Sequence, residues 1–211
     1  MAELLLIRHG VTAWNRERRF QGQTDIPLDD EGHLQAQRLA AALSASGVAA
    51  VYASDLARAW QTAKPLADAL GLPLIAERGL RERHYGMFEG KTFDALERDH
   101  AADFERWRHR DPDFELPGGG ESLRVLHARV EAALTALARR HPGQRVAAVT
   151  HGGVLDCAYR VATGLGLAEP RRHHILNASI NRIGFEEGEF RLIDWGDVGH
   201  LGYTDGDVAR D

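Results

Sequence analysis

Residues 4–7 form a short, wholly apolar run (LLLI) that leads directly into Arg8 and His9. Residues 145–150 form a second, mostly apolar stretch, which leads into His151. Short strands without apolar/polar alternation are typical of parallel sheets that carry helices on both faces. The two stretches therefore favour folds in which a covering helix follows each strand.

Segments with helical spacing of apolar residues do follow these strand candidates. Asp29 and the acidic residues 30–31 are expected to start the first helix. Ser54 or Asp55 is expected to cap the next one, which Pro65 should kink. A single helical region is expected over about 93–110, and further helices over 123–141 and from 153 onward.

Strands that alternate with helices indicate an α/β fold with three layers, α/β/α, and a mostly parallel central sheet. The chain of 211 residues fits one domain (1–211), with a helical insertion at about 90–120 over the ligand crevice. Residues 179–195 predict a terminal hairpin that turns at Glu187 and Gly188. The tail after about Asp205 is expected to be loose.

Charge and cysteine content exclude several classes of protein. The net charge of −5, without a polybasic block, argues against nucleic acid as a partner. No apolar run is long enough to span a membrane or to form a signal peptide, and Cys157 has no second cysteine to pair with. A cytoplasmic location is therefore expected. No histidine spacing typical of a zinc site is present, so no metal is expected.

Ligands of parallel sheets bind in the crevice at the carboxyl ends of the strands. Arg8 and His9 end the first strand, Arg58 lies just past the second, and His151 follows a later one. Each has a simpler explanation if taken singly: a rim salt bridge, a surface arginine, or a hydrogen-bonded structural histidine. Their convergence indicates a bound phosphate, because cations packed together repel and an arginine in the first turn of a helix opposes its dipole.

Phosphoryl transfer could use these groups. Nearby arginines disfavour the charged form of a histidine, which keeps a lone pair available to attack phosphorus. The reaction also needs an acid for the leaving oxygen. Glu82 is a candidate because it follows Leu80 in a loop, although it is one of 31 acidic residues. It would have to hold a proton near neutral pH, which burial or the substrate phosphate could arrange.

Several motifs together resemble the histidine phosphatase superfamily, in the branch shared by cofactor-dependent phosphoglycerate mutases and small broad-specificity phosphatases. The motifs, in chain order, are LLLIRHGVTAWNRERRFQG, DIPLDDEGHLQAQ, YASDLARAWQTA, LRERHYGMFEG, PGGGES and VTHGGVLDC. The resemblance covers residues 4 to about 195. It implies a phosphoglycerate mutase-like fold.

The resemblance also implies roles for individual residues. His9 would be the nucleophile that becomes phosphohistidine, and Glu82 the proton donor. Arg8, Arg58 and His151 would surround the phosphoryl group. The remaining residues would contact phosphate or substrate: Asn15, Gln21, Gly22, Tyr85 and, through its backbone N–H, Gly152. We expect Gly10 to let the phosphate approach the backbone.

Three functions stay open at this point. The region between Gly90 and Pro117 has only about 26 residues and no adjacent arginine pair, which departs from the mutase pattern and favours a phosphatase acting on a small phosphorylated metabolite. The alternatives are a mutase that interconverts 3- and 2-phosphoglycerate, the only case that would need 2,3-bisphosphoglycerate as cofactor, and a binding module without catalysis. A homodimer formed at the terminal hairpin and Trp195 is also open, with core packing of Trp195 as the alternative.

Overall fold

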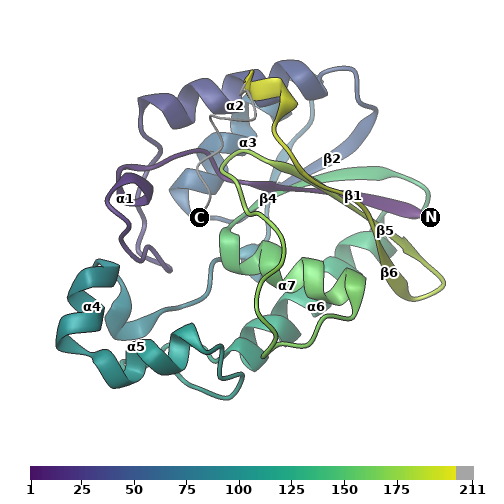
Figure 1. Cartoon of the computed structure of the whole chain (residues 1–211). Helices are drawn as coiled ribbons and strands as arrows, with labels where there is room; N and C mark the ends of the chain where they lie inside the picture. Colours follow the sequence, from purple (N-terminus) through teal and green to yellow (C-terminus); the bar gives the residue numbers. More distant parts are fainter. Residues whose placement is uncertain (203–211) are drawn as a thin grey trace.

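The computed structural model describes residues 1–202, which form a sheet between two layers of helices (Figure 1). The tail after about Asp205, expected to be loose, lies outside these residues. Within them the strands are β1 (Ala2–Arg8), β2 (Val48–Ala53), β3 (Leu74–Ala76), β4 (Arg145–Thr150), β5 (Ile180–Glu186) and β6 (Glu189–Asp197). The helices are α1 (Ala13–Arg16), α2 (Asp30–Leu43), α3 (Ala57–Leu70), α4 (Phe93–Asp99), α5 (Ala101–Arg108), α6 (Leu123–Arg140) and α7 (Gly152–Thr163).

The sheet has the strand order β3-β2-β4-β1-β5-β6. Strands β1 to β4 pair in parallel, and the hairpin of β5 and β6 joins β1 in the antiparallel direction. Helices α2 and α3 cover one face, and α6 and α7 cover the other (Figure 1). The predicted three-layer fold with a mostly parallel sheet and a terminal hairpin is confirmed.

The core explains why the first strand is apolar throughout. Leu4 and Leu6 pack in the cluster on the side of α6 and α7, whereas Leu5 and Ile7 pack in the cluster on the side of α2 and α3. All four side chains are almost fully buried. Burial stabilises each by roughly 1.5–3 kcal/mol relative to exposure. Both faces of the strand must therefore be apolar.

The pairing of β1 with β4 sets the position of the functional ends. The last pair in the ladder is Arg8 opposite Thr150, so the next residue on each strand is a histidine. The backbone N–H of His9 donates to Thr150 O at 2.9 Å. The end of β2 lies beside them, because the N–H of Ser54 donates to Val149 O at 3.0 Å. Three strand ends thus open on one crevice.

Two details of the predicted helices are wrong. The region 93–110 is two helices, because His100 has φ −141° and ψ 40°, outside the helical range. The N-cap of α3 is Leu56, and neither Ser54 nor Asp55 caps it. Asp25 Oδ1 instead accepts from the N–H of Ala57 at 2.7 Å.

The expected cap residue Asp55 bonds another residue, and Pro65, which was expected to kink α3, lies inside the helix. The Asp55 carboxylate accepts from Arg81 at 2.6 and 2.7 Å, which anchors the segment that leads to Glu82. Helix α3 runs through Pro65 without interruption. Proline therefore removes one hydrogen-bond donor from α3 without ending the helix.

The insertion has an apolar core of its own. Phe104 of α5 packs with Phe20, Phe88 and Leu96, and Trp107 stacks on Phe104 with ring centroids 5.3 Å apart. Helices α4 and α5 stand at one end of the molecule, apart from the layers that cover the sheet (Figure 1). The aromatic cluster therefore fixes them to the loop that follows α1 rather than to the sheet.

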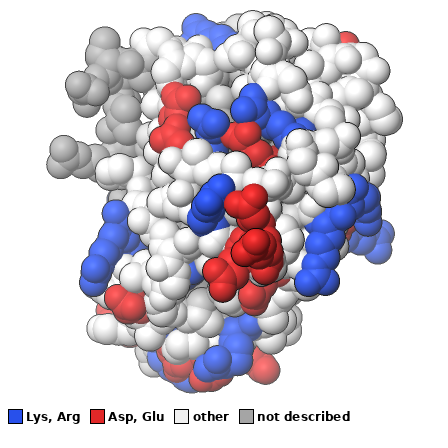
Figure 2. Space-filling model, turned by 90° about the vertical axis from the view of Figure 1, so that its right-hand side faces the viewer, with Lys and Arg blue, Asp and Glu red and all other residues white. Residues whose placement is uncertain are grey.

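The hairpin end and the surface around the N-terminus carry mixed charge. Figure 2 shows acidic and basic side chains lying beside one another on this side of the molecule. Glu3, for example, bonds both Arg145 and Arg182 at 2.8 to 2.9 Å. Trp195 packs edge-on against Tyr159, with ring centroids 5.0 Å apart. Core packing is thus the role that Trp195 has within the chain.

Candidate active site

His9 stands at the carboxyl end of β1 with its ring orientation fixed. Its Nδ1 lies 2.7 Å from Gly10 O. A carbonyl oxygen can only accept, so Nδ1 carries the proton and Nε2 keeps the lone pair. Asn177 holds the same backbone, because its Nδ2 donates to His9 O at 3.0 Å. The reactive nitrogen of His9 is therefore Nε2.

His151 lies next to His9, as the parallel pairing of their strands requires. The ring centroids are 5.2 Å apart and the ring planes are inclined by 56°. His151 is fully buried, and neither of its ring nitrogens has a hydrogen-bond partner within residues 1–202. A buried polar group without a partner is costly, so the site is suited to a polar ligand that bonds it.

Both histidines are neutral near pH 7. Burial lowers the pKa of His9 well below its usual value of 6.5, and the charges of Arg58 and Arg8 lower it further. The pKa of His151 is lowered for the same reasons, with burial the largest. The arrangement that makes a protonated histidine unfavourable also leaves the Nε2 lone pair of His9 available.

Arg58 is the second residue of α3 and is fully buried, so it is not a surface arginine. Its two terminal nitrogens donate to Thr24 O at 3.0 Å and Gly22 O at 2.7 Å. Burial lowers its pKa to about 10, which still leaves it charged at neutral pH. Thr62 fixes the same helix turn against the first strand, because its hydroxyl donates to Arg58 O and accepts from the N–H of Gly10.

Glu82 lies against the beginning of α7. Both of its carboxylate oxygens accept from the N–H of Gly153 at 3.1 Å, and Oε1 also accepts from the N–H of Arg83 at 2.7 Å. A Cβ on Gly153 would lie 2.3 Å from Glu82 Oε1, so only glycine allows this approach. A residue from a loop is thereby held at the same sheet edge as the two histidines.

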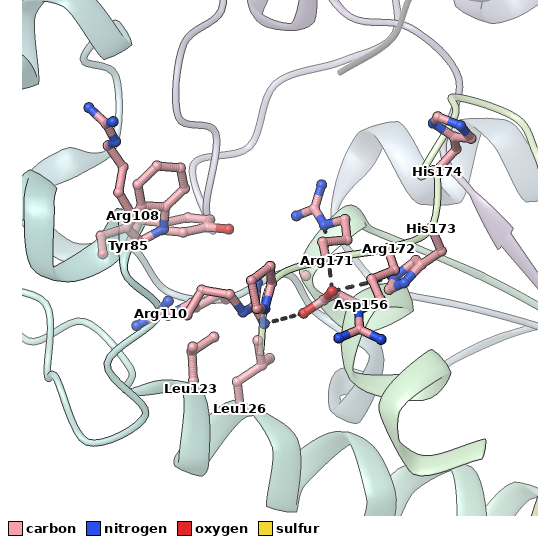
Figure 3. A pocket seen from close by; sticks show the side chains of 14 residues that line it. Tyr85, Arg108, Arg110, Leu123, Leu126, Asp156, Arg171, Arg172, His173 and His174 are labelled. Carbon is pink, nitrogen blue, oxygen red and sulfur yellow. Dashed lines mark hydrogen bonds and ion pairs between the residues drawn. The ribbon is translucent and has the colours of Figure 1, made fainter. Parts of the chain in front are cut away.

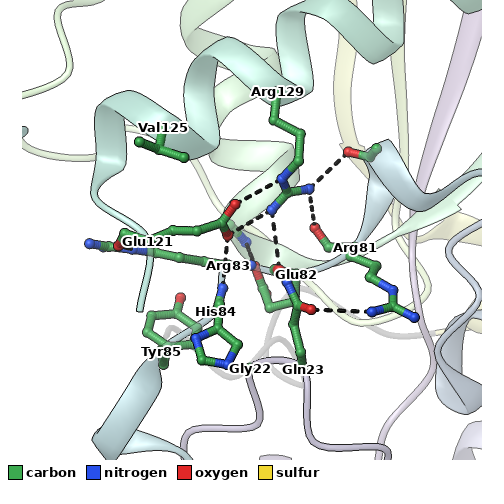
Figure 4. A network of polar contacts seen from close by, with 12 residues as sticks. Gly22, Gln23, Arg81, Glu82, Arg83, His84, Tyr85, Glu121, Val125 and Arg129 are labelled. Atoms are coloured by element: carbon green, nitrogen blue, oxygen red, sulfur yellow. Dashed lines mark hydrogen bonds and ion pairs between the residues drawn. The ribbon is translucent and has the colours of Figure 1, made fainter. Parts of the chain in front are cut away.

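A network of polar contacts holds the loop that carries Glu82 (Figure 4). The guanidinium of Arg129, on α6, donates to the carbonyls of Gly79, Arg81 and Glu82 at 2.9 to 3.3 Å. Its remaining bonds go to the Glu121 carboxylate at 2.8 and 2.9 Å. Because Glu121 is only half-buried and faces Arg129, this network positions the loop and takes no direct part in the site.

A cavity of about 300 Å³, here called the phosphate cavity, brings the predicted residues together. Its lining includes nine of the ten residues expected from the sequence: Arg8, His9, Asn15, Gln21, Gly22, Arg58, Glu82, Tyr85 and Gly152. His151 is not part of the lining, and its ring centroid lies 5.2 Å from that of His9, which is part of it. The expected convergence is therefore present in the fold.

Comparison with known proteins gives the family. The model of the histidine phosphatase superfamily (branch 1) matches residues 4–198. The chain belongs to the histidine phosphatase superfamily. It is 39% identical over 206 residues to phosphoglycerate mutase-like protein 4 of Arabidopsis thaliana, a match that covers 96% of this chain and 88% of the relative.

Solved structures of similar proteins support the same family. YhfR of Bacillus stearothermophilus is 33% identical with a TM-score of 0.87, covering 95% of this chain and 100% of that one. A mycobacterial glucosyl-3-phosphoglycerate phosphatase is 29% identical with a TM-score of 0.83, covering 92% and 98%. The resemblance seen in the sequence motifs is confirmed, and the protein is a histidine phosphatase superfamily member with a phosphatase-like or mutase-like site.

Sequence reasoning missed a further group of residues in this histidine phosphatase site. Trp14 also lines the cavity. The lining residues that were not anticipated are Arg18, Arg19, Phe20, Phe93, Trp107, Gly153, Arg171 and Ile175. Most come from loops or from the insertion, where no periodic pattern marks a side chain as facing a cavity. The density of arginine in residues 16–19 is the one signal that could have indicated some of them.

The structure gives Gly10 a packing role, and the approach of a phosphate to its backbone stays a prediction. A Cβ on Gly10 would lie 2.7 Å from Gly32 O, so glycine is required by the packing of the loop after β1 against the beginning of α2.

Asn15 lines the phosphate cavity, where it was expected to make a polar contact. Its Oδ1 accepts from Thr12 in the capping box of α1, which leaves its amide nitrogen as the group that can donate.

The described residues hold neither a cluster of metal ligands nor a membrane-spanning helix. Within residues 1–202 no three His, Cys, Asp or Glu side chains lie close enough together to hold a metal ion. The helices of the same residues include none that is long and apolar enough to cross a membrane. Cys157 is free and buried, and burial raises its pKa.

Proposed function

We propose that the protein is a phosphomonoesterase that hydrolyses small phosphorylated metabolites through a phosphohistidine on His9. One observation carries this proposal. The Nδ1 of His9 is engaged by Gly10 O, and the ring is kept neutral between Arg8 and Arg58. An exposed lone pair beside two phosphate-binding cations is the arrangement that in-line attack on phosphorus needs.

The first step transfers the phosphoryl group to the protein. The Nε2 lone pair of His9 forms the P–N bond while the ester P–O bond breaks, and Arg8 and Arg58 neutralise the phosphoryl oxygens. Glu82 gives a proton to the departing alcohol oxygen.

The second step returns the protein to its starting state. The Glu82 carboxylate takes a proton from water as the water oxygen attacks phosphorus. The P–N bond breaks, inorganic phosphate leaves and the lone pair returns to His9. No metal or cofactor takes part in either step, so the atoms and charges balance with water as the only co-substrate.

Two observations favour hydrolysis over mutase activity. The insertion consists of two short helices, α4 and α5, and carries no adjacent arginine pair. A similar structure is a phosphatase by name, whereas the Arabidopsis relative is named for its likeness to phosphoglycerate mutase. A mutase must shield its phosphohistidine from water while the bound phosphoglycerate changes its orientation in the site. The short insertion is less suited to this shielding.

Hydrolysis of 4-nitrophenyl phosphate by the pure protein in the presence of EDTA tests the proposal. We expect phosphate release that depends on His9 and does not need added metal. Absence of release, or release that His9→Ala leaves unchanged, would contradict it. A coupled assay with 3-phosphoglycerate, with and without 2,3-bisphosphoglycerate, tests the alternative. Isomerisation that exceeds hydrolysis and requires the bisphosphate would identify a mutase.

A further inference from the structure

A second cavity, here called the arginine cavity, adjoins the phosphate cavity (Figure 3). Its volume is about 620 Å³, roughly twice that of the phosphate cavity. The two cavities share four lining residues, Tyr85, Trp107, Gly153 and Arg171. A molecule whose phosphate lies at His9 can therefore extend past these residues into the larger space.

Arginine dominates the lining of this cavity. Five arginines line it, against one acidic residue, Asp156. Asp156 Oδ2 lies 2.6 Å from Arg110 and 3.0 Å from Arg160, and its Oδ1 lies 3.5 Å from Arg171. The Asp156 carboxylate is almost fully buried, and Figure 3 shows its contacts with Arg110 and Arg171. Three guanidinium groups thus share one carboxylate.

Neither titration nor burial cancels this excess of positive charge. Although burial opposes it, the surrounding guanidiniums hold the pKa of Asp156 below its usual value, so its single negative charge is fully present at neutral pH. Burial lowers the pKa of His173, 3.4 Å from Asp156, to about 4, so this histidine adds no charge. Among residues 1–202, Asp156 is the only carboxylate in ion-pair contact with these three guanidiniums, so two of their charges have no counter-charge there.

Arg83 adds a further positive charge on the side towards Glu82. It is buried, and its guanidinium donates to the backbone carbonyls of Glu121 and Phe114. Backbone carbonyls satisfy the hydrogen bonds of a guanidinium without neutralising it. A protein with net charge −5 thus concentrates cations around two connected cavities, whereas its opposite side carries mixed charge (Figure 2). Such local charge attracts anionic ligands.

We propose that the arginine cavity binds a second anionic group, a carboxylate or a phosphate, on the alcohol part of the substrate, with Arg171 as the residue that selects for it. This rests on the proposed function, because it places the scissile phosphate at His9. Arg171 lies between the cavities, and Leu123, Leu126 and Trp107 offer apolar surface for the carbon chain. The volume favours a substrate longer than a three-carbon phosphate ester.

Three esters of equal chain length test the inference: hexyl phosphate, 6-phosphonooxyhexanoate and 1,6-hexanediol bisphosphate. We expect kcat/KM for at least one anionic-tailed ester to exceed that of hexyl phosphate by about tenfold or more, the usual effect of a charge-assisted bond to arginine. The two anionic tails distinguish carboxylate from phosphate. Equal kcat/KM for all three esters would overturn the inference and leave the proposed function intact.

Binding to His9→Ala protein tests the cavity without turnover. Calorimetry should give a Kd for at least one anionic-tailed ester about tenfold or more below that for hexyl phosphate. This difference exceeds the statistical advantage that the bisphosphate has because either of its two identical phosphates can bind at position 9. This result would support the inference even if no ester were hydrolysed, an outcome that would contradict only the proposed function. Equal Kd values would overturn the inference.

Substitution of Arg171 assigns the effect to this cavity. Arg171→Gln should abolish most of the preference for anionic tails, and Arg171→Lys should keep part of it. Asp156 retains Arg110 and Arg160 in both variants, so the cavity wall remains in place. Arg98→Gln is the matched control, because Arg98 is exposed and pairs with Asp99 on α4. A preference that survives Arg171→Gln unchanged would contradict the role of this residue.

Discussion

Arg58 and Arg171, the arginines on which the two proposals depend, are held in different ways. In the phosphate cavity Arg58 is fully buried and bonds backbone carbonyls, so its position is fixed by the fold. In the arginine cavity Arg171 is 42% exposed and is held by one carboxylate contact of 3.5 Å. The first arrangement is rigid and the second can adjust. The chemical step needs fixed geometry, whereas recognition of a tail tolerates movement.

This difference follows from where the residues lie in the fold. The phosphate cavity is built on the ends of β1 and β4 and on α3, all anchored in the core. The arginine cavity is built on the end of α5, the beginning of α6 and residues 170–174. Substitutions in the first region should change the rate of every substrate, and substitutions in the second should change which substrates are used.

The largest effect is expected from His9→Ala. Loss of the nucleophile should lower kcat for 4-nitrophenyl phosphate by at least about a thousandfold, because no other group can form the phosphoenzyme. Quenching with SDS at alkaline pH during turnover should trap an acid-labile phosphoprotein only with intact His9. His33→Ala, at an exposed histidine of α2, is the control and should keep full activity. A phosphoprotein formed by His9→Ala would place the nucleophile elsewhere.

Glu82→Gln should separate good from poor leaving groups. Hydrolysis of hexyl phosphate should fall by about a hundredfold, because the alkoxide needs a proton as it leaves. Hydrolysis of 4-nitrophenyl phosphate should fall by less than about tenfold in kcat, because its leaving group needs little protonation. Glu187→Gln, in the exposed hairpin turn, should change neither rate. Equal losses on both esters would show that Glu82 is not the acid.

Arg129→Met should weaken the support of the phosphate cavity. The substitution removes the five hydrogen bonds that Arg129 donates to the Glu121 carboxylate and to three backbone carbonyls. We expect a loss of about 2 kcal/mol in the free energy of unfolding, below the 3–5 kcal/mol of a fully buried pair, because Arg129 is 24% exposed. Urea denaturation measures this. Arg124→Met, at an exposed arginine on the same helix, should leave the midpoint unchanged, and so should Arg171→Gln.

Acid should destabilise the phosphate cavity through its neutral histidines. The pKa values of His9 and His151 are lowered in the folded state, so the unfolded chain binds more protons once the pH falls below 6.5. Stability present above pH 6.5 is then lost as the pH falls, by up to about 1.4 kcal/mol per pH unit for each histidine. Urea midpoints between pH 7.5 and 5.5 measure the slope.

The matched variants for this slope are single asparagine substitutions. His9→Asn or His151→Asn should reduce the slope, because one group that titrates only in the unfolded chain is removed. His33→Asn should leave it unchanged, since this histidine is exposed. A midpoint that does not fall between pH 7.5 and 5.5 would show that the two histidines are protonated in the folded protein as readily as in the unfolded chain.

The phosphate cavity could be predicted from the sequence because strand ends mark it. An apolar run such as residues 4–7 identifies a buried strand, and the edge at which parallel strands end is fixed by topology. Arg8, His9 and His151 follow from this rule. Glu82 does not, because it lies in a loop whose position depends on bonds from Arg129 and Gly153 that are distant in sequence. Its place after Leu80 made it one candidate among 31 acidic residues, and the family motif singled it out.

The arginine cavity could not be predicted for a related reason. Arg171 follows α7 in a segment with no periodic pattern, and its place depends on a contact with Asp156 across a turn of the chain. The cap of α3 shows the same limit on a smaller scale. Asp55 has a suitable side chain at a suitable position, yet a bidentate bond to Arg81 engages it instead. Which hydrogen-bond partner a side chain takes depends on residues that are distant in the sequence, so the local sequence does not predict it.

The order of strands in the sheet has a consequence for how the protein forms. β1 pairs with β4 and β5, both of which come from the last third of the chain. During synthesis β1 is thus made first, and both of its neighbours in the sheet are made much later. Until β4 and β5 have been made, residues 4–7 are an unpaired apolar segment of the kind that aggregates or binds chaperones. Because His9 meets His151 only through that late pairing, recovery of activity during refolding should report the final docking of the N-terminal strand.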